Sequence, residues 1–401
     1  MKVIGITAEY NPFHTGHAYQ IAQSRRIAGG ETAVIAVMSG HWVQQADCAI
    51  ADKWTRARLA LMGGADLVLE LPTPWATASA ERFCRGAVTL LDRTGVVDHI
   101  SFGSECGDLD RLQRTARCLD SGDFRAALLL QLNQGLSFPA ARQRAVEMLA
   151  GPEEAALLSG ANNNLGVEYI RALNALHSTM TPLTVTRQGA GHNTFTEDLP
   201  FASATQIRRS LRRDEIRGAL TYLIPGGAEL LESTPLSHLT YLERPMLARL
   251  RTMTAADWAA LPDSGAAEGL PRRLESAAME SRSVEEFLDR AKTKRYTHAR
   301  LRRLLLWAWL GLTAEDFPEM PPYLRVLGFN PRGQVLLKQM KQRASLPLLT
   351  KPAHARNLDE AGKRLFRLEA RCTDLYDLCF ADIPAPGREW TTDPVRLTEG
   401  D

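Results

Sequence analysis

The chain has 401 residues, of which 45% are hydrophobic and 23% are charged, and its formal net charge is +2 at pH 7. At about 150 residues per domain, this length predicts two to three domains. The composition is that of an ordinary globular protein with a sizeable core, which excludes a disordered chain, a collagen and a small disulfide-stapled scaffold. Because the net charge is close to zero, a polyanionic partner must meet a local basic surface.

Cysteine usage and hydropathy bear on the compartment. The six cysteines are sparse and show no C-x-x-C spacing, which argues against structural zinc and for a reducing compartment. The longest apolar run, around residues 304–312, is about half of the roughly 20 residues that a membrane span requires. The N-terminus carries Glu9 and Pro12 before any long apolar stretch, unlike an export signal. We therefore expect a soluble, cytoplasmic protein without a membrane partner.

Short β-branched runs alternate with helix-like stretches in the first half of the chain. Strands are expected at residues 2–7, 32–38, 66–71 and 99–102, with a weaker fifth at 183–186, and helices at 17–27, 51–62 and 79–91. This alternation predicts right-handed βαβ units and a parallel sheet covered on both faces. Ligands of such sheets bind beyond the carboxyl ends of the strands.

The character of the sequence changes after about residue 215. From there the chain is rich in Leu, Ala and Arg, and helical spacing dominates, with Phe287, Leu301 and Leu304 on one face. We therefore expect an α/β fold with a Rossmann-like domain over residues 1–215, followed by a mainly α-helical domain over residues 216–401.

The strongest motif is EYNPFHTGH at residues 9–17, directly after the first expected strand. Pro12 suits a turn that enters a helix, because its φ is already helical and it lacks an N–H. His14 and His17 then fall on one face of the first turn, and Gly16 leaves that face open to a base or ribose. Helix N-termini bind phosphate, and two imidazoles there can donate hydrogen bonds to charge that develops on it. The motif therefore predicts a nucleotide site.

Blander interpretations of the two histidines exist. His14 and His17 are also compatible with ordinary core or surface histidines, or with an incomplete metal pair. Two histidines alone make a poor zinc site, since zinc usually has three or four protein ligands. No Cys or His lies close by in sequence to complete the set, so we expect no metal site built from the chain.

A second motif, SATQIR, occupies residues 203–208. Ser203 and Thr205 supply hydroxyls and a helix N-cap, and Arg208 offers a fork for two phosphate oxygens. Without the first motif, an ordinary capped helix with solvated arginines would be the preferred interpretation.

These segments resemble known families. HTGH resembles the HxGH motif of the adenylyl-transferring superfamily, and SATQIR resembles the S-x-T-x-I-R element of small-molecule nucleotidyltransferases. Read in order, a set of blocks resembles the bacterial tRNA(Met) cytidine acetate ligase family: GITAEYNPFHTGH, VMSGHWVQQADCAIADKWTRARLALMGGADLVLELP, SFGSECGD, NNNLGVEYIRAL, SATQIRR, KTKRYTHARLRRLLL and PPYLRVLGFNPRG.

The resemblance implies an ATP-dependent carbon–nitrogen ligase with a Rossmann-like HxGH nucleotidyltransferase domain. Such enzymes convert acetate and ATP to acetyl-adenylate and pyrophosphate, and then acetylate N4 of the wobble cytidine of elongator tRNA(Met). The implied partners are ATP, acetate and the tRNA anticodon loop, and Mg²⁺ is expected because it normally accompanies ATP phosphates. The implied catalytic residues are His14, His17 and Arg208. The implied ATP contacts are Thr7, Ala8, Glu9, Tyr10, Asn11, Pro12, Phe13, His14, Thr15, Gly16, His17, Ala18, Tyr19, Gln20, Gly103, Asn162, Arg187, Ser203 and Thr205.

One segment departs from the family pattern. Where the family has SGNFVQRG, this chain has SGHWVQQA at residues 39–46, so His41, Gln45 and Ala46 replace an asparagine, an arginine and a glycine. Loss of the arginine removes a positive charge that could serve acetate or phosphate, unless Lys53 or Arg56 compensates. The sequence leaves open whether activity is impaired.

A basic segment lies in the helical half of the chain. Residues 292–303 contain six Lys or Arg residues and no carboxylate, with an aromatic residue among them. Such a surface suits phosphate neutralisation and base stacking in a single-stranded loop, although charge runs are usually solvated helix faces. The expected RNA contacts are Lys292, Lys294, Arg295, Tyr296, Arg302 and Arg303.

Two other functions remain open. A small-molecule adenylyltransferase that makes a dinucleotide cofactor would explain both short motifs. It would not explain the function of the Arg-rich helical half. A non-catalytic homologue that binds RNA or a nucleotide would explain the departure at Gln45. The sequence does not predict an oligomeric state.

Overall fold

A computed structural model describes residues 1–187, 202–212 and 216–398 of the chain. Its centre is an eight-stranded sheet with the order β10-β8-β5-β2-β1-β6-β7, and β9 pairs with β8. The parallel part consists of β1 (Lys2–Ala8), β2 (Thr32–Ser39), β5 (Leu67–Leu71), β6 (His99–Ser104) and β7 (Thr181–Thr186). All five expected strands are present, and the prediction of a parallel sheet is confirmed.

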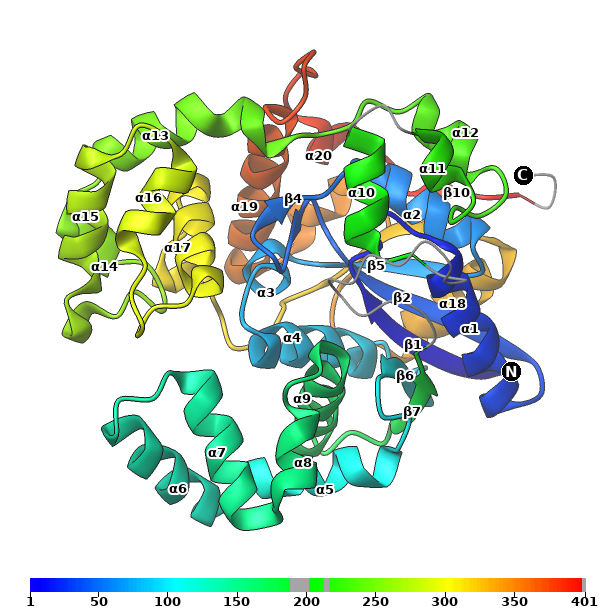
Figure 1. The fold of residues 1–401 in the computed structure, drawn as a ribbon. Coiled ribbons are helices and arrows are strands. Elements are labelled where there is room, and N and C mark those ends of the chain that lie inside the picture. The colour runs from blue at the N-terminus through cyan, green and yellow to red at the C-terminus, as the bar shows by residue number, and fades with distance from the viewer. Residues whose placement is uncertain (188–201, 213–215, 399–401) are drawn as a thin grey trace.

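Helices cover both faces of this sheet (Figure 1). The three expected helices are α1 (Thr15–Ala28), α2 (Lys53–Met62) and α4 (Ala80–Arg93), and a further one is α9 (Ala161–Ala175). Side chains alternate between the faces along a strand, so Ile4 and Ile6 of β1 pack with α1 and α2, whereas Val3 packs in the core that contains α4 and α9. The carboxyl edge of the sheet lies between these two cores.

The sheet continues beyond residue 215. β8 (Leu324–Phe329) pairs antiparallel with β5, and both β9 (Leu348–Leu349) and β10 (Val395–Arg396) pair with β8. Mixed sheets of this kind often carry an antiparallel strand beside a parallel set. Strands from both sides of residue 215 therefore share one sheet, and the division of domains at that residue stays a prediction.

The remaining helices form the connections and two lobes. Figure 1 shows α13–α17 gathered in one lobe at the left, and α6 and α7 in another below it. Their bounds are α3 Thr73–Ala76, α5 Leu109–Asp120, α6 Gly122–Asn133, α7 Phe138–Ala150, α8 Pro152–Leu157, α10 Ala204–Arg212, α11 Ile216–Leu220, α12 Gly227–Glu232, α13 Glu243–Arg251, α14 Ala255–Ala259, α15 Leu270–Glu280, α16 Val284–Ala291, α17 His298–Leu310, α18 Pro331–Arg343, α19 Glu360–Asp377 and α20 Arg388–Thr391. Short elements are β3 (Trp42–Val43), β4 (Asp47–Cys48), η1 (Leu239–Leu242), η2 (Ala266–Glu268), η3 (Ala314–Asp316) and η4 (Pro352–Asn357).

Buried charges join the C-terminal helices to the sheet. Lys53, the first residue of α2, has no exposed surface, and its ammonium lies 2.7 Å from Glu70 of β5 and 2.5 Å from Glu389 of α20. Arg325 of β8 lies 3.4 Å from the same Glu389. Because buried charges are tolerated only when paired, these contacts hold α20 against the N-terminal half.

Hydropathy and length also bear on membrane spans. Within the described residues, every helix is too short or too polar to cross a bilayer.

Candidate active site

A cavity of about 230 Å³ opens at the carboxyl edge of the parallel strands. Its walls come from the ends of β1, β6 and β7, the N-terminus of α1, the loop after β2, α4, α9 and the start of α10. Many of the predicted ATP contacts line it: Thr7, Ala8, Glu9, Tyr10, Asn11, His14, Gly16, His17, Tyr19, Gln20, Gly103, Asn162, Arg187 and Ser203. The fold therefore brings together segments that are up to 196 residues apart in sequence, from Thr7 to Ser203.

The other predicted contacts lie close to this cavity but do not line it. They are Pro12, Phe13, Thr15, Ala18, Thr205 and Arg208. Phe13 is fully buried and faces Gly63, where an added Cβ would lie 2.1 Å from the Phe13 ring. The packing of Phe13 against Gly63 therefore fixes the turn between β1 and α1.

The two histidines close the N-terminus of α1. His14 is the N-cap residue, so α1 begins at Thr15 and His14 precedes the first turn rather than lying within it. The His14 Nδ1 accepts a hydrogen bond from the Gly16 amide at 3.0 Å, and the His17 Nδ1 accepts one from the His14 amide at 3.2 Å. Since both Nδ1 atoms are acceptors, the proton of each neutral ring is on Nε2, and each ring can donate through that atom.

The electrostatic surroundings keep both rings neutral. Burial, followed by the charges of Arg187 and Arg208, lowers the pKa of His14 to about 3. Burial, followed by His14 and Arg187, lowers the pKa of His17 well below its usual value. The ring centroids are only 3.8 Å apart, so two imidazolium charges here would repel strongly. The pair can thus serve a phosphate as hydrogen-bond donors and not as cations.

Arg208 braces the turn that carries these histidines. Its guanidinium is largely buried and donates to the Asn11 carbonyl oxygen at 2.7 Å and to the Thr205 hydroxyl at 3.2 Å. The Asn11 side chain in turn accepts a hydrogen bond from the Ile50 amide at 2.7 Å. The Ser203 hydroxyl accepts from the Gln206 amide at the start of α10, as an N-cap does. A phosphate contact of Arg208 stays a prediction.

Asn162 and Arg187 contact each other directly, and Asn162 is also held by Glu105, a residue that the sequence did not single out. Glu105 accepts hydrogen bonds from the backbone and side-chain amides of Asn162 at 3.0 and 2.7 Å, and from the Asn163 amide at 2.6 Å. Arg187 donates to the side-chain carbonyl oxygen of Asn162 at 2.9 Å. Burial raises the pKa of Glu105, but these hydrogen bonds outweigh it and hold the pKa below the usual value. Its place directly after a strand end was the available signal.

The segment that departs from the family pattern borders the cavity. Gln45 lines it, together with Gln44, whose backbone N–H donates to the Glu9 carboxylate at 2.8 Å. His41 instead stacks on Tyr376, with ring centroids 4.3 Å apart, and Ala46 has a φ of 57°, a conformation that suits glycine better. The departure at Gln45 therefore changes the wall of the cavity itself.

Neither of the two suggested compensating cations reaches this wall. Lys53 is occupied by its two buried carboxylates. Arg56 is completely buried and donates to the carbonyl oxygens of Glu9, Ser39 and Gly40. The suggestion that Lys53 or Arg56 supplies the missing charge in the cavity is therefore wrong, because both side chains are committed to internal partners.

The basic segment of residues 292–303 is only partly available to a ligand. Lys292, Lys294, Arg295 and Arg302 are exposed. Tyr296 is not, because its side chain is buried, with 5% exposure, and its hydroxyl donates to the Glu268 carbonyl oxygen at 2.9 Å. The expected stacking of Tyr296 on a base is therefore wrong for this structure.

A salt bridge also engages Arg303, which lies 3.2 Å from Asp263. Since this carboxylate offsets part of its charge, Arg303 is a weaker phosphate ligand than the exposed Arg302.

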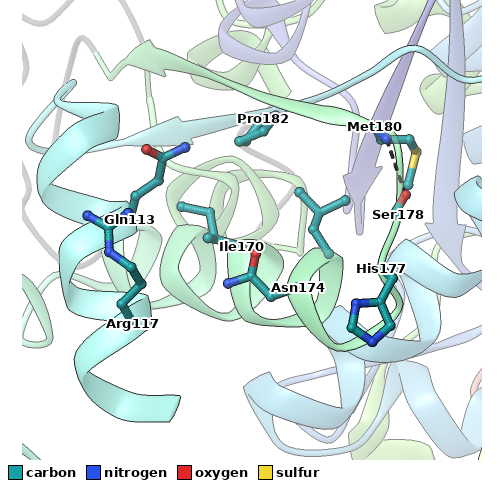
Figure 2. A pocket seen from close by; sticks show the side chains of 9 residues that line it. Gln113, Arg117, Ile170, Asn174, His177, Ser178, Met180 and Pro182 are labelled. Carbon is teal, nitrogen blue, oxygen red and sulfur yellow. Dashed lines mark hydrogen bonds between the residues drawn. The ribbon is translucent and has the colours of Figure 1, made fainter. Parts of the chain in front are cut away.

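Another cavity, of about 490 Å³, lies at the opposite end of the sheet (Figure 2). Gln113 and Arg117 of α5 face Ile170 and Asn174 of α9 across it, beside Pro182 at the start of β7. None of the predicted site residues lines it. Because parallel sheets bind ligands at their carboxyl ends, the first cavity is the candidate active site.

Comparison with known proteins places the chain among nucleotidyltransferases. A family model described as HIGH nucleotidyl transferase matches residues 1–388. The chain is 36% identical over 394 residues to a tRNA(Met) cytidine acetate ligase of Caldanaerobacter subterraneus, with 96% of each chain covered. It is 36% identical over 417 residues to one of Acetivibrio thermocellus, with 98% of this chain and 99% of that protein covered.

Solved structures agree in fold. A crystal structure of Thermotoga maritima TmcAL bound with alpha-thio ATP is similar, with a TM-score of 0.91, 32% identity and coverage of 99% of this chain and 100% of that one. The apo form of the same protein gives a TM-score of 0.93 and 33% identity over the same shares.

Proposed function

This chain belongs to the HIGH nucleotidyltransferases and, among them, to the tRNA(Met) cytidine acetate ligase family, and from this premise we propose that it joins acetate to N4 of the wobble cytidine of elongator tRNA(Met) at the expense of ATP. One observation supports the proposal most: a single cavity gathers His14, His17, Gly103, Asn162 and Arg187. The resemblance found in the sequence is confirmed at the level of the family.

The first step forms acetyl-adenylate. A carboxylate oxygen of acetate attacks the α-phosphorus of ATP, the new P–O bond forms, and the bond from the α-phosphorus to the bridging oxygen breaks, so that pyrophosphate leaves with the electron pair. His14 and His17 donate from Nε2 to the phosphate oxygens, with the N-terminus of α1 behind them. Removing one such donor typically costs about 2.7–4 kcal/mol of transition-state stabilisation.

The second step transfers the acetyl group. The N4 amine of cytidine attacks the carbonyl carbon of the adenylate, the C–N bond forms, the C–O bond to AMP breaks, and the amine proton passes to solvent. Acetyl-adenylate is a reactive mixed anhydride, so positioning of the amine supplies much of the acceleration. The wobble base must be splayed out of its stack, which costs a few kcal/mol and less in a loop than in a duplex.

Mg²⁺ would enter this site with ATP, because it normally accompanies the phosphates. The cavity walls do not form a cation site of their own: among the described lining residues, Glu9 alone carries a carboxylate. No group of three or more His, Cys, Asp or Glu side chains that could hold a metal occurs in the described part of the chain. We therefore assign no step to a metal held by the protein.

The tRNA would be held by exposed basic side chains of the lobe that α13–α17 form. Lys294 and Arg295 lie in the turn before α17, and Arg302 lies on that helix, all three exposed. Such groups neutralise phosphates of the anticodon loop. Because ATP and tRNA are both cytoplasmic, we infer that the protein acts there.

A second candidate function follows from Gln45. This side chain lines the cavity where the family has an arginine, so a homologue that binds a nucleotide or RNA without turnover is the alternative to test.

The deciding experiment is to incubate the purified protein with ATP, labelled acetate and total tRNA, and then to digest the RNA to nucleosides. We expect ATP-dependent label in N4-acetylcytidine and acetate-dependent release of pyrophosphate. ATP binding without either product would support the non-catalytic alternative. Release of pyrophosphate that requires a phosphorylated small molecule and not acetate would support a small-molecule adenylyltransferase.

A further inference from the structure

The active-site cavity extends across the carboxyl edge of β1 to a second, mainly apolar wall. Phe83 of α4, Phe102 of β6, and Leu165 and Tyr169 of α9 line this part, next to Thr7 at the end of β1. The three aromatic residues belong to the core on the face covered by α4 and α9, and Leu165 packs against the same core. The residues of the α1 face, such as Tyr10, belong to the other core. We define Phe83, Phe102, Leu165 and Tyr169 as the apolar wall.

The apolar wall is held firmly in place. The rings of Phe102 and Tyr169 are 5.5 Å apart between centroids. α9 approaches Phe102 closely at Gly166, where an added Cβ would lie 2.8 Å from the ring. Cys84 of α4 donates to the Leu165 carbonyl oxygen at 3.7 Å. Because such packed side chains sit in fixed positions, the wall limits the size of what fits against it.

Two hydroxyl groups accompany this wall. The Thr7 hydroxyl is buried, and it lies beside the Tyr169 hydroxyl, which also neighbours the Cys84 thiol. Burial raises the pKa of Tyr169 well above its usual value, so its phenol stays protonated and can donate at neutral pH. When one hydroxyl of such a pair donates to the other, the second O–H remains free to donate to a ligand. The wall thus offers donors at one end and an apolar surface beside them.

The geometry of the first step requires a reactant on this side. In phosphoryl transfer, the attacking and leaving oxygens lie roughly in line through the phosphorus. With the pyrophosphate held at His14 and His17 on the α1 side, the nucleophile must approach from across β1, where the apolar wall lies. Acetate fits the chemistry there, because its carboxylate can accept from the Thr7–Tyr169 hydroxyl pair while its methyl group packs on apolar side chains.

We propose that the apolar wall is the subsite for the carboxylic acid substrate and that Phe83, Phe102, Leu165 and Tyr169 restrict that substrate to two carbons. This inference rests on the proposed function, since it names the place and the size limit of acetate within that reaction. Leu165 is the wall residue with the most exposed surface, being half-buried where the other three are buried. It is therefore the side chain whose truncation enlarges the subsite with least damage to the core.

The test is carboxylate-dependent ATP–pyrophosphate exchange, measured without tRNA, with acetate, propionate and butyrate. In Leu165→Ala we expect the ratio of kcat/KM for propionate to that for acetate to rise about tenfold, because one methylene changes discrimination by about 10–200-fold. Leu176→Ala is the matched control: this leucine also is half-buried against the same core, at the far end of α9 and outside the cavity. It should keep the wild-type ratio.

A second variant addresses the donors. Tyr169→Phe keeps the ring and removes the hydroxyl, so we expect the KM for acetate to rise about tenfold with the KM for ATP unchanged, as for removal of a hydrogen bond to a charged group.

If Leu165→Ala does not fold, the smaller truncation Leu165→Val gives the same comparison.

The outcomes distinguish failure of the proposed subsite from failure of the proposed function. The proposed subsite would be overturned if the propionate-to-acetate ratio in Leu165→Ala equalled the ratio in Leu176→Ala. The same holds for Leu165→Val where that variant replaces Leu165→Ala. A Tyr169→Phe variant whose KM for ATP rises with that for acetate would overturn it too, because the hydroxyl then serves the nucleotide. A wild-type protein without acetate-dependent exchange would instead refute the proposed function.

Discussion

At the scale of single residues, His14 and His17 have two tasks. Their Nδ1 atoms close the N-terminus of α1 in a reciprocal capping box, and this fixes Nε2 as the donor of each ring. The sequence predicted the donors from the H-x-x-H spacing and the preceding strand. It did not predict the capping box, because imidazoles are uncommon caps and the exact start of a helix is the least certain feature of a sequence-based prediction.

Separating the two tasks gives the first prediction. His17→Ala loses both the cap and the donor, whereas His17→Gln keeps an N3 side chain that can complete a capping box. We expect both variants to reduce acetyl-adenylate formation by about 10²–10³, and only His17→Ala to lower the melting temperature clearly. Binding of tRNA should be nearly unchanged in both. Wild-type exchange rates in His17→Gln would remove this imidazole from the chemistry.

The depressed pKa of His14 gives the second prediction. Its folded value is about 3 against 6.5 for an ordinary histidine, so between these values the unfolded chain binds a proton that the folded one does not. Folding stability should therefore fall as the pH drops from about 6.5 toward 3. His14→Asn, which retains a good N-cap residue, should show a flatter decline in urea unfolding between pH 6.5 and 4. An identical pH dependence of the two proteins would contradict the neutral imidazole.

At the scale of elements, the sequence predicted the strands that alternate with helices and missed others. The five parallel strands and three of the helices around them follow from β-branched runs and helical periodicity, which are local signals. β8 was missed because its antiparallel partner β5 is more than 250 residues away in the chain. The helices α5–α8, which lie between β6 and β7, were not predicted.

The buried ion pairs that connect α20 to α2 and the sheet give the third prediction. Lys53→Met leaves Glu70 and Glu389 without their shared cation in a buried site. Removing one partner of a buried ion pair typically costs about 3–5 kcal/mol, and we expect a decrease in the free energy of unfolding of that size in urea. Arg85→Ala, which breaks an exposed pair with Glu319, is the control and should cost less than about 1 kcal/mol. Equal small decreases in both variants would mean that the buried pairs do not join the two halves.

At the scale of the whole molecule, the active site is assembled from segments that no local pattern connects. The HxGH and SATQIR motifs could be predicted because each carries its chemistry within a few residues. Phe83 and Tyr169 could not, because their positions depend on how α4 and α9 pack on the sheet, whereas Glu105 was signalled by its place after a strand end. The RNA contacts of the basic segment stay a prediction, and the burial of Tyr296 could not be predicted because it depends on packing in the core and on a hydrogen bond to Glu268.

The RNA surface gives the fourth prediction. Replacing the exposed Lys294, Arg295 and Arg302 together by Gln should weaken tRNA binding and reduce the slope of log K against log salt by about 0.7–0.9 for each phosphate that the variant no longer neutralises. Acetate-dependent exchange without tRNA should be unchanged. The control is the triple replacement of Arg114, Arg117 and Arg125, which are exposed on α5 and α6. If only the control variant changes the slope, the tRNA binds to the other helical lobe.

The proposed reaction depends on two neutral imidazoles, at the turn after β1, that bind the triphosphate of ATP. The most direct measurement is a crystal structure of this protein with a non-hydrolysable ATP analogue, in which the distance from each Nε2 to the nearest phosphate oxygen is read. We expect hydrogen-bond distances of about 2.7–3.2 Å for both His14 and His17. A triphosphate bound away from the N-terminus of α1, with both rings facing protein atoms only, would contradict it.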